Sequence, residues 1–317
     1  MMYSWKDVMF YFKMEYLPIF TINNEPLIIS TILDMGKSDI TKKVIEYYDN
    51  KTQKPFFVLL SWHCVELAIN ETVNKIKTLF ENDYVLLVNT KKDENILKKY
   101  GVNVLFCHHN CFLDYDIFKI TSTIKKYDAI YIAQAVKWKR IELAKEIESL
   151  ALICYENIND DNYDISYVNQ LKKDNRLINI KYDQITQISP NQVCELINKS
   201  KVGLILSEYE GGNYATTEYL LCGLPVISTK NKGGRDLFFD QYNSIEINGN
   251  NEIKPNDIGL LENKNPNIIR LNTISLMKKG INDYNEYMLH LFPNVTISEN
   301  GLFGNYTNKL IEWMSIN

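Results

Sequence analysis

The fold is decided by residues 202–229, which read VGLILSEYEGGNYATTEYLLCGLPVIST. The apolar run at 202–206 is typical of a buried strand in a parallel sheet. Residues 214–222 are predicted to be a helix that ends at Gly223, because glycine can adopt the left-handed conformation and a proline follows shortly after. A second apolar run occupies 226–229. The segment is therefore predicted to be a strand–helix–strand unit.

The same alternation continues upstream through most of the chain. Further strands are predicted in the second half at 129–133, 150–155 and 178–182, and in the first half at 27–33, 56–61, 84–89 and 102–107. Helical spacing of apolar residues predicts helices between them at 38–48, 63–80, 91–100, 139–149, 164–173 and 190–199. This order predicts two doubly wound α/β domains, each a parallel sheet covered by helices on both faces.

The domain boundaries follow from where the alternation stops. Residues 107–127 show neither a strand nor a helix period, so they are predicted to connect the domains. The predicted parts are a first domain at 1–112, a linker at 113–126, a second domain at 127–301 and a helix at 302–317 that packs back on the first domain. Residues 3–17 are predicted to be an amphipathic helix that packs on the core.

Composition indicates a globular protein. Of the 317 residues, 45% are hydrophobic and 23% charged, with 13 Gly and 8 Pro, which excludes disordered and collagen-like classes. A single core stops growing at about 250–300 residues, so the length favours two domains. The 35 basic and 39 acidic residues give a net charge of -4, which argues against binding to nucleic acid.

Cysteine usage and hydropathy indicate the compartment. The six cysteines lie mostly far apart in a chain large enough to fold without disulfides, so we expect free thiols in a reducing cytoplasm. No run approaches the roughly 18 apolar residues that a membrane span needs, and the charged first twenty residues are unlike a signal peptide. We expect a cytoplasmic protein, either free or in peripheral contact with the inner face of a membrane.

The loop after the strand at 202–206 carries the first candidate functional residues. Ligands of open parallel sheets bind beyond the carboxyl ends of the strands. Glu210 lies in this loop and Glu218 two turns into the following helix, so the two carboxylates can face one cleft. Gly211 and Gly212 allow the backbone to approach a ligand at a helix start, which favours anions. The loop suits a polyhydroxylated ligand that carries phosphate.

Two further loops add positive charge near this position. Lys139 and Arg140 follow the strand at 129–133, where they can neutralise a diphosphate. The loop at 231–236 adds a Gly-Gly pair and another cation. Taken alone, Lys139-Arg140 is more typical of a solvated helix surface than of a phosphate-binding site. The joint position of the three loops at strand ends indicates a site for a phosphorylated sugar.

These residues resemble a known family, the retaining family 4 glycosyltransferases with the GT-B fold. The similarity to their Glu-x7-Glu segment is carried by Ser207-Glu208-Tyr209-Glu210-Gly211, Glu218, the run from Leu220 to Thr229 and Gly233-Gly234. Upstream, Asn110-Cys111-Phe112-Leu113-Asp114 and Phe118 are similar to the Asn-Gly-Val-Asp…Phe turn of the family, and 131–140 occupies the place of its Gly-Arg-x4-Lys-Gly loop. The resemblance extends over residues 84–250 and implies two Rossmann-like domains that face each other across a cleft.

The resemblance also assigns roles to individual residues. Glu210 would contact hydroxyls of the transferred sugar, Glu218 the ribose hydroxyls and Lys139 the diphosphate, with Arg140 in support. His63 follows the strand at 56–61 and resembles a family histidine near the transferred sugar, although a structural histidine is equally compatible with the sequence. The other expected donor-binding residues are Gly211, Gly212, Asn213, Gly233 and Gly234.

The sequence departs from the family at three places. Gln134 stands where an arginine of the diphosphate site is expected, so one positive charge is missing. Gly212 and Asn213 replace an aromatic residue and a glycine, which changes the wall of the sugar pocket. The first domain has only the four predicted strands, fewer than usual, which leaves the acceptor class open.

The predicted function is the transfer of a sugar, with retention of configuration, from a nucleoside diphosphate sugar to a glycan or lipid-linked acceptor of a bacterial surface polysaccharide. No cofactor is expected and no metal, because Lys139 would neutralise the leaving group and the Cys and His residues at 107–111 fit no common zinc spacing. Two alternatives stay open: a nucleotide-sugar epimerase of the same fold, and a non-catalytic protein that binds sugar nucleotides or glycans.

Overall fold

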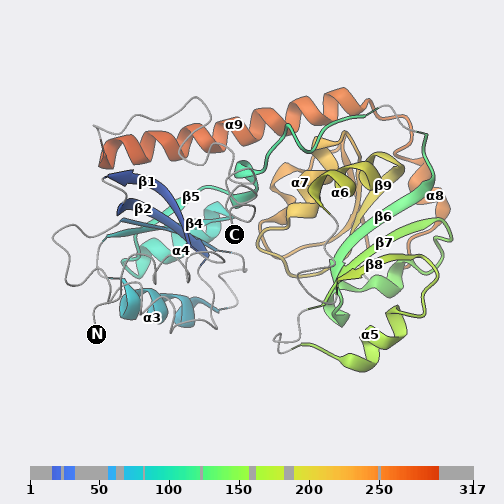
Figure 1. The fold of residues 1–317 in the computed structure, drawn as a ribbon, viewed down its shortest axis with the longest axis horizontal. Helices are drawn as coiled ribbons and strands as arrows, with labels where there is room; N and C mark the ends of the chain where they lie inside the picture. Colours follow the sequence, from blue (N-terminus) through green and yellow to red (C-terminus); the bar gives the residue numbers. More distant parts are fainter. Residues whose placement is uncertain are drawn as a thin grey trace.

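The structure is a computed structural model that describes residues 16–22, 25–32, 56–61, 68–80, 83–121, 124–156, 162–181, 189–248 and 251–292. Within these ranges the chain forms two α/β lobes that lie side by side, with one long helix running along both (Figure 1). The first lobe is built on strands β1 to β5 and the second lobe on strands β6 to β11. The two sheets confirm the predicted α/β fold class.

The first lobe is built on a five-stranded sheet with the order β1-β2-β3-β4-β5. Its strands are β1 (Tyr16–Ile22), β2 (Glu25–Ile32), β3 (Phe56–Leu60), β4 (Tyr84–Val88) and β5 (Val104–Phe106). Strands β2 to β5 are parallel, as predicted. Almost every residue of β3 and β4 is buried, which explains why these strands have continuous apolar sequences.

Strand β1 is a fifth strand where the sequence predicts four, and residues 16 and 17 belong to it rather than to the predicted helix at 3–17. It pairs antiparallel with β2 at the edge of the sheet. Its sequence YLPIFTI is rich in aromatic and β-branched residues, and Pro18 is tolerated because an edge strand need not donate every backbone N–H. The helical spacing of apolar residues just upstream hid this strand. Residues 3–15 and the helix predicted at 38–48 lie outside the described residues.

Two helices connect the strands of the first lobe. Helix α3 (Ile69–Leu79) lies between β3 and β4, and α4 (Lys91–Lys99) lies between β4 and β5. Both were predicted, although the residues at 62–67 before α3 lie outside the described ranges. The Thr90 hydroxyl caps α4 by accepting a hydrogen bond from the Asp93 N–H at 2.9 Å. Because β3 and β4 are parallel, both strands end at the same edge of the sheet.

The second lobe is built on a parallel sheet with the order β11-β10-β9-β6-β7-β8. Its strands are β6 (Tyr127–Gln134), β7 (Leu150–Tyr155), β8 (Leu177–Lys181), β9 (Ser200–Ile205), β10 (Val226–Thr229) and β11 (Ser244–Ile247). Five of the six match predicted strands to within two residues. Strand β11 was missed because its sequence SIEI alternates polar and apolar residues over only four positions and has no continuous apolar run.

The helices of the second lobe begin and end largely where local chemistry predicts. They are α5 (Ile165–Leu171), α6 (Pro190–Asn198), α7 (Tyr214–Leu221) and α8 (Pro255–Gly259). Helix α6 has a capping box between Ser189 and Gln192. Helix α7 stops before Gly223, whose φ of 71° is left-handed as predicted.

The helix predicted at 139–149 is wrong. The structure has two short 3₁₀ helices instead, Lys137–Lys139 and Ile141–Ala144. They are separated by Arg140, a non-glycine residue with a left-handed φ of 52°. The Arg140 guanidinium donates to the Leu206 carbonyl at 2.6 Å and the Thr229 hydroxyl at 2.7 Å. These long-range bonds accompany a backbone conformation that is incompatible with one continuous helix.

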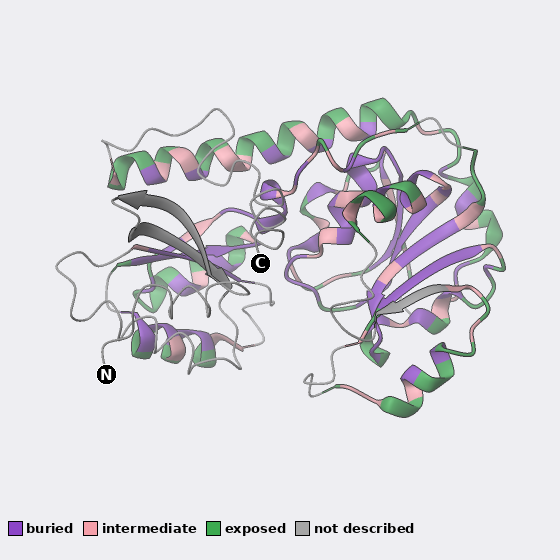
Figure 2. Ribbon diagram, in the orientation of Figure 1, coloured by how far each residue is buried: buried purple, intermediate pink, exposed green. Residues whose placement is uncertain are grey.

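The core of the second lobe lies along its central strands. Burial is densest on β6, β7, β9 and β10, and the helices expose their outer faces (Figure 2). One hydrophobic cluster fills one side of this sheet and a second cluster, which includes Tyr219 and Leu220 of α7, fills the other. Covered on both faces, the sheet has only its strand ends and edges to offer to a ligand.

Helix α9 (Pro266–Leu291) runs along both lobes (Figure 1). Its first half buries Ile269 and Met277 against α7, and its second half buries Tyr284 and Met288 against β3 and β4. One continuous helix therefore packs on both hydrophobic cores. Among the described residues, no helix is both long and apolar enough to span a membrane.

The connection between the lobes packs on the second lobe. Phe118 is buried in the second-lobe core. Arg270 of α9 donates to the carbonyls of Tyr115 and Phe118 at 2.6 and 2.5 Å. The boundaries at 1–112, 113–126 and 127–301 stay predictions, and the helix predicted at 302–317 lies outside the described residues.

Candidate functional site

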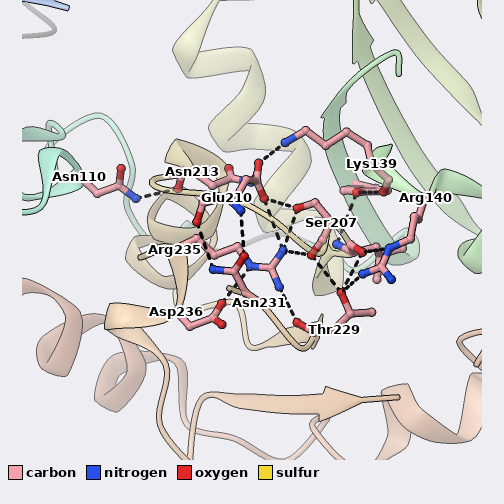
Figure 3. Close-up of polar contacts among 12 residues, drawn as sticks. Asn110, Lys139, Arg140, Ser207, Glu210, Asn213, Thr229, Asn231, Arg235 and Asp236 are labelled. Carbon is pink, nitrogen blue, oxygen red and sulfur yellow. Dashed lines mark hydrogen bonds and ion pairs between the residues drawn. The ribbon is translucent and has the colours of Figure 1, made fainter. Parts of the chain in front are cut away.

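The candidate site is a buried charged cluster at the carboxyl edge of the second sheet. Strands β6, β9 and β10 are neighbours in the sheet, so the loops that follow them meet. These loops bring together Lys139, Glu210 and Arg235 (Figure 3). The meeting of the three loops was predicted, as were Lys139 and Glu210.

The Glu210 carboxylate is the centre of the cluster. Its Oε1 accepts hydrogen bonds from Lys139 Nζ and, at 2.9 Å, from Asn213 Nδ2. Its Oε2 accepts from the Ser207 hydroxyl and lies 3.4 Å from Arg235 Nη1. The side chain is 8% exposed, so these contacts replace water almost completely.

Electrostatics keep Glu210 ionised. Burial alone would raise the pKa of this carboxyl, but the positive charges of Lys139 and Arg235 outweigh burial and lower it. Lys139 is 5% exposed and Arg235 is fully buried. Because the pKa is lower in the folded state, the pairing contributes stability above the unfolded pKa, and this contribution is lost as the pH falls.

Arg235 is the site residue that sequence analysis missed. Its guanidinium donates to the Ser207 carbonyl at 2.6 Å, to the Thr229 carbonyl and to Asp236 at 2.9 Å. The sequence showed a cation directly after a Gly-Gly pair, but nothing in it indicated complete burial. Arg235 thus connects the loops after β9 and β10 and fixes the position of a positive charge beside Glu210.

Arg140 lies at the rim of the same cluster. Its bonds to the Leu206 carbonyl and the Thr229 hydroxyl link the ends of β9 and β10 (Figure 3). This position is compatible with the supporting electrostatic role expected from the resemblance. These contacts also give Arg140 a structural role. They link the ends of β9 and β10, and Ser207 and Glu210 lie in the loop directly after β9.

Three of the predicted glycines stand at very close contacts. A Cβ on Gly233 would lie 1.8 Å from the Glu210 carbonyl oxygen, and one on Gly212 would lie 2.0 Å from the His109 ring. A Cβ on Gly234 would lie 2.5 Å from the Asn89 carbonyl oxygen. Gly211 is also buried. The absence of side chains therefore lets the loop after β10 pack on the loop after β9, and lets the first lobe reach both.

The first lobe contacts the candidate site through His109 and Asn110. Asn110 Nδ2 donates to the Asn213 carbonyl and to the Thr217 hydroxyl, both at 2.7 Å. The His109 N–H donates to Asn89 Oδ1 at 3.2 Å, where Asn89 directly follows β4. Hydrogen bonds therefore connect the strand ends of the first lobe to the loop that carries Glu210.

Glu218 does not join the charged cluster. It lies on α7, partly buried, and the structure shows no hydrogen bond or ion pair between its carboxyl and another described residue. Burial, with a smaller contribution from Cys194, raises its pKa to about 8. The predicted ribose contact would supply hydrogen-bond partners that this carboxyl lacks in the described part of the protein.

Replacing Glu218 with glutamine should stabilise the ligand-free protein at alkaline pH. A raised carboxyl pKa means that the folded state binds more protons than the unfolded state between the ordinary glutamate pKa of 4.5 and about 8, so stability falls as the pH rises through this window. The variant removes this loss, with a gain that approaches about 1.4 kcal/mol for each pH unit of the window. Urea unfolding at pH 5 and pH 8.5 measures it.

The exposed Glu208 provides the matched control for this experiment. Its pKa is lowered by the hydrogen bond and charge of Lys232, so Glu208→Gln should show no gain on raising the pH. A Glu218→Gln variant whose stability relative to wild type is the same at both pH values would show that the carboxyl is not held protonated by burial.

The histidines considered from the sequence are His63, His108 and His109. His63 lies outside the described residues. Burial lowers the pKa of His109 to about 4 and that of His108 well below its usual range, so both rings are neutral at physiological pH. Among the described residues no group of three or more His, Cys, Asp or Glu side chains could hold a metal ion.

Sequence comparison finds a similarity within the second lobe and the segment before it. Residues 115–254 match the family described as Glycosyl transferases group 1. The matched region contains Lys139, Glu210, Glu218 and Arg235, and includes strands β6 to β11. A comparison of the whole chain with curated proteins gave no match.

Structural comparison extends the similarity to both lobes. Anabaena HepE in complex with UDP-glucose superposes with a TM-score of 0.56 at 13% identity, over 80% of this chain and 77% of that chain. The same protein in complex with UDP superposes with a TM-score of 0.53 at 12% identity, over 81% of this chain and 77% of that chain. Sucrose-phosphate synthase from Thermosynechococcus elongatus superposes with a TM-score of 0.53 at 12% identity, over 84% of this chain and 71% of that chain. The two Rossmann-like lobes therefore have the GT-B architecture, which confirms the predicted fold.

Proposed function

We propose, from the match of residues 115–254 to group 1 glycosyl transferases, that the protein is a retaining glycosyltransferase that uses a nucleoside diphosphate sugar. The observation that carries the proposal is the buried cluster of Lys139, Glu210 and Arg235 at the carboxyl edge of the second sheet, within the matched region. Ligands of doubly wound sheets bind at this edge.

The cluster has the chemistry that sugar transfer requires. The departing diphosphate needs a preorganised positive charge, which Lys139 would supply, and the positive sugar of the transition state is stabilised by the nearby Glu210 carboxylate. We assign sugar hydroxyl contacts to Glu210 and ribose contacts to Glu218. Arg235 keeps Glu210 ionised, and the backbone of the glycine loops with Asn213 lines the donor.

We further propose the substrates and the location. UDP-sugars are the first donors to test, since the similar HepE structure contains UDP-glucose. The acceptor is a glycan or a lipid-linked sugar of a bacterial surface polysaccharide, modified in the cytoplasm with peripheral contact to the membrane. No metal or other cofactor takes part.

The deciding experiment has two stages. Thermal shift with UDP-, GDP-, ADP- and CMP-sugars finds the donor, because a ligand of the native state raises its stability. Turnover with glycan acceptors is then followed by NMR, and we expect free nucleoside diphosphate and a product with the anomeric configuration of the donor. A new sugar nucleotide without release of nucleotide would indicate an epimerase, an inverted product would exclude retention, and binding without turnover would indicate a binding protein.

Transfer should survive metal chelation. Lys139 and Arg235 are buried cations of the candidate site, and we propose that Lys139 supplies the positive charge for which a divalent cation would otherwise be needed. We expect the initial rate in EDTA to equal that in Mg²⁺ or Mn²⁺ within experimental error. A complete loss of rate that Mn²⁺ or Mg²⁺ restores would contradict the assignment of leaving-group stabilisation to side chains.

A further inference from the structure

All the hydrogen-bonding capacity of Glu210 is used within the protein. An ionised carboxylate offers about four acceptor positions. Lys139 and Asn213 occupy Oε1, while Ser207 and Arg235 occupy Oε2. A hydroxyl of a donor sugar can therefore bond to Glu210 at full strength only when one of these four partners leaves.

Of the four partners, Lys139 is the one free to leave. Arg235 is fully buried and tied to the Ser207 carbonyl and to Asp236, at 2.6 and 2.9 Å. Ser207 and Asn213 are short side chains of the same loop as Glu210. The Lys139 ammonium makes no hydrogen bond to any other described residue, and its long stem carries a compact charge of the kind that binds phosphate.

We propose that binding of the nucleoside diphosphate moves Lys139 from Glu210 to the diphosphate and so opens Glu210 Oε1 to a sugar hydroxyl. This inference rests on the proposed function and adds an order to it. In the ligand-free protein Lys139 masks the group that recognises the sugar, and the diphosphate removes the mask. Glu210 then binds a sugar hydroxyl only when the sugar is attached to a nucleoside diphosphate or binds together with one.

The surroundings of Lys139 permit this exchange. The ammonium lies 4.4 Å from the centre of the Trp138 ring. This cation–π contact can stabilise the positive charge while Lys139 changes partner. When Lys139 leaves, Glu210 keeps Arg235 at 3.4 Å and its bonds to Ser207 and Asn213. The carboxylate is therefore not left as an unpaired buried charge.

The exchange predicts an unusual effect of a site mutation. In the wild type, Glu210 and the diphosphate compete for Lys139. Glu210→Gln weakens the internal contact, so it should tighten binding of UDP and of inorganic pyrophosphate about fivefold or more. In a Lys139→Met background there is no ammonium to release, so the same substitution should leave both affinities nearly unchanged.

Calorimetry on wild type, Lys139→Met, Glu210→Gln and the double variant tests the exchange, with UDP and pyrophosphate as probes. The matched control is Lys137→Met, which removes an exposed cation paired with Asp164 from the same short helix. In the Lys137→Met background we expect Glu210→Gln to tighten binding as it does in wild type. Circular dichroism melts verify that each variant is folded.

The outcomes separate the exchange from the proposed function. Equal tightening by Glu210→Gln with and without Lys139 would show simple removal of a negative charge, and would overturn the exchange alone. If wild type binds neither UDP nor pyrophosphate, the donor site itself is overturned. A second measurement uses wild-type protein and so does not depend on the folding of a variant. The ¹⁵Nζ NMR signal of Lys139 should shift when pyrophosphate is added. An unchanged signal in protein that binds pyrophosphate would overturn the exchange.

Discussion

Glu210→Gln is expected to lower kcat of sugar transfer by about 10²–10³ or more, since it removes the carboxylate beside the developing positive charge of the sugar. The same substitution leaves the buried Lys139 without its anionic partner, whereas Arg235 keeps its ion pair with Asp236 at 2.9 Å. Removing one partner of a buried pair typically costs about 3–5 kcal/mol of stability. Steady-state kinetics and urea unfolding measure the two effects on the same protein.

The control for this prediction separates loss of chemistry from loss of fold. Total stability of a domain is about 5–15 kcal/mol, so a loss of about 3–5 kcal/mol is a large fraction of it, and urea unfolding first establishes that the variant is folded at 25 °C. Lys139→Met combined with Glu210→Gln removes one cation along with the anion, and should recover part of the stability without recovering activity. A Glu210→Gln enzyme that turns over like wild type would show that Glu210 is not in the catalytic site.

Lys139→Ala is expected to lower kcat by about 10²–10³, equivalent to about 2.7–4 kcal/mol, which is typical for removal of one preorganised donor from a developing oxyanion. Gln134 ends strand β6 nearby as a neutral side chain, so it cannot replace the lost charge. Single-turnover rates with the identified donor test the effect, since they isolate the chemical step from product release.

The neighbouring Lys137 provides the control for Lys139. It is exposed and pairs with Asp164 on the surface, so Lys137→Ala should leave the single-turnover rate within about twofold of wild type. Equal rates for wild type, Lys137→Ala and Lys139→Ala would eliminate the diphosphate site at Lys139. Stability should change less than in Glu210→Gln, because Glu210 keeps Arg235 at 3.4 Å.

The structure gives a reason for two residues, Gly212 and Asn213, at which the sequence differs from the family that it resembles. The His109 ring from the first lobe occupies the space beside Gly212, where an added Cβ would lie only 2.0 Å away. The Asn213 amide donates to Glu210 at 2.9 Å, and Asn110 holds the Asn213 carbonyl at 2.7 Å. The first lobe thus forms part of the surroundings of Glu210, the residue proposed to contact the sugar.

The sequence alone determined the elements whose causes are local. Continuous apolar runs located β3, β4 and β7, because a strand buried on both faces needs an apolar side chain at nearly every position. Caps at Ser189 and Gly223 determined helix ends through hydrogen bonds and dihedral freedom within a few residues. Lys139 and Glu210 could be predicted as neighbours because parallel strands end at a common edge.

The tertiary structure decided the features whose causes are distant in the chain. Arg140 adopts a left-handed conformation while its guanidinium bonds to residues 66 and 89 positions away, so the helix predicted at 139–149 is absent. Arg235 is buried only because strand β9 and its loop surround it, and β1 is a strand because β2 is available to pair with it. Local propensities are worth tenths of a kcal/mol per residue, whereas leaving a buried charge without its partner costs about 3–5 kcal/mol, so long-range contacts prevail where the two disagree.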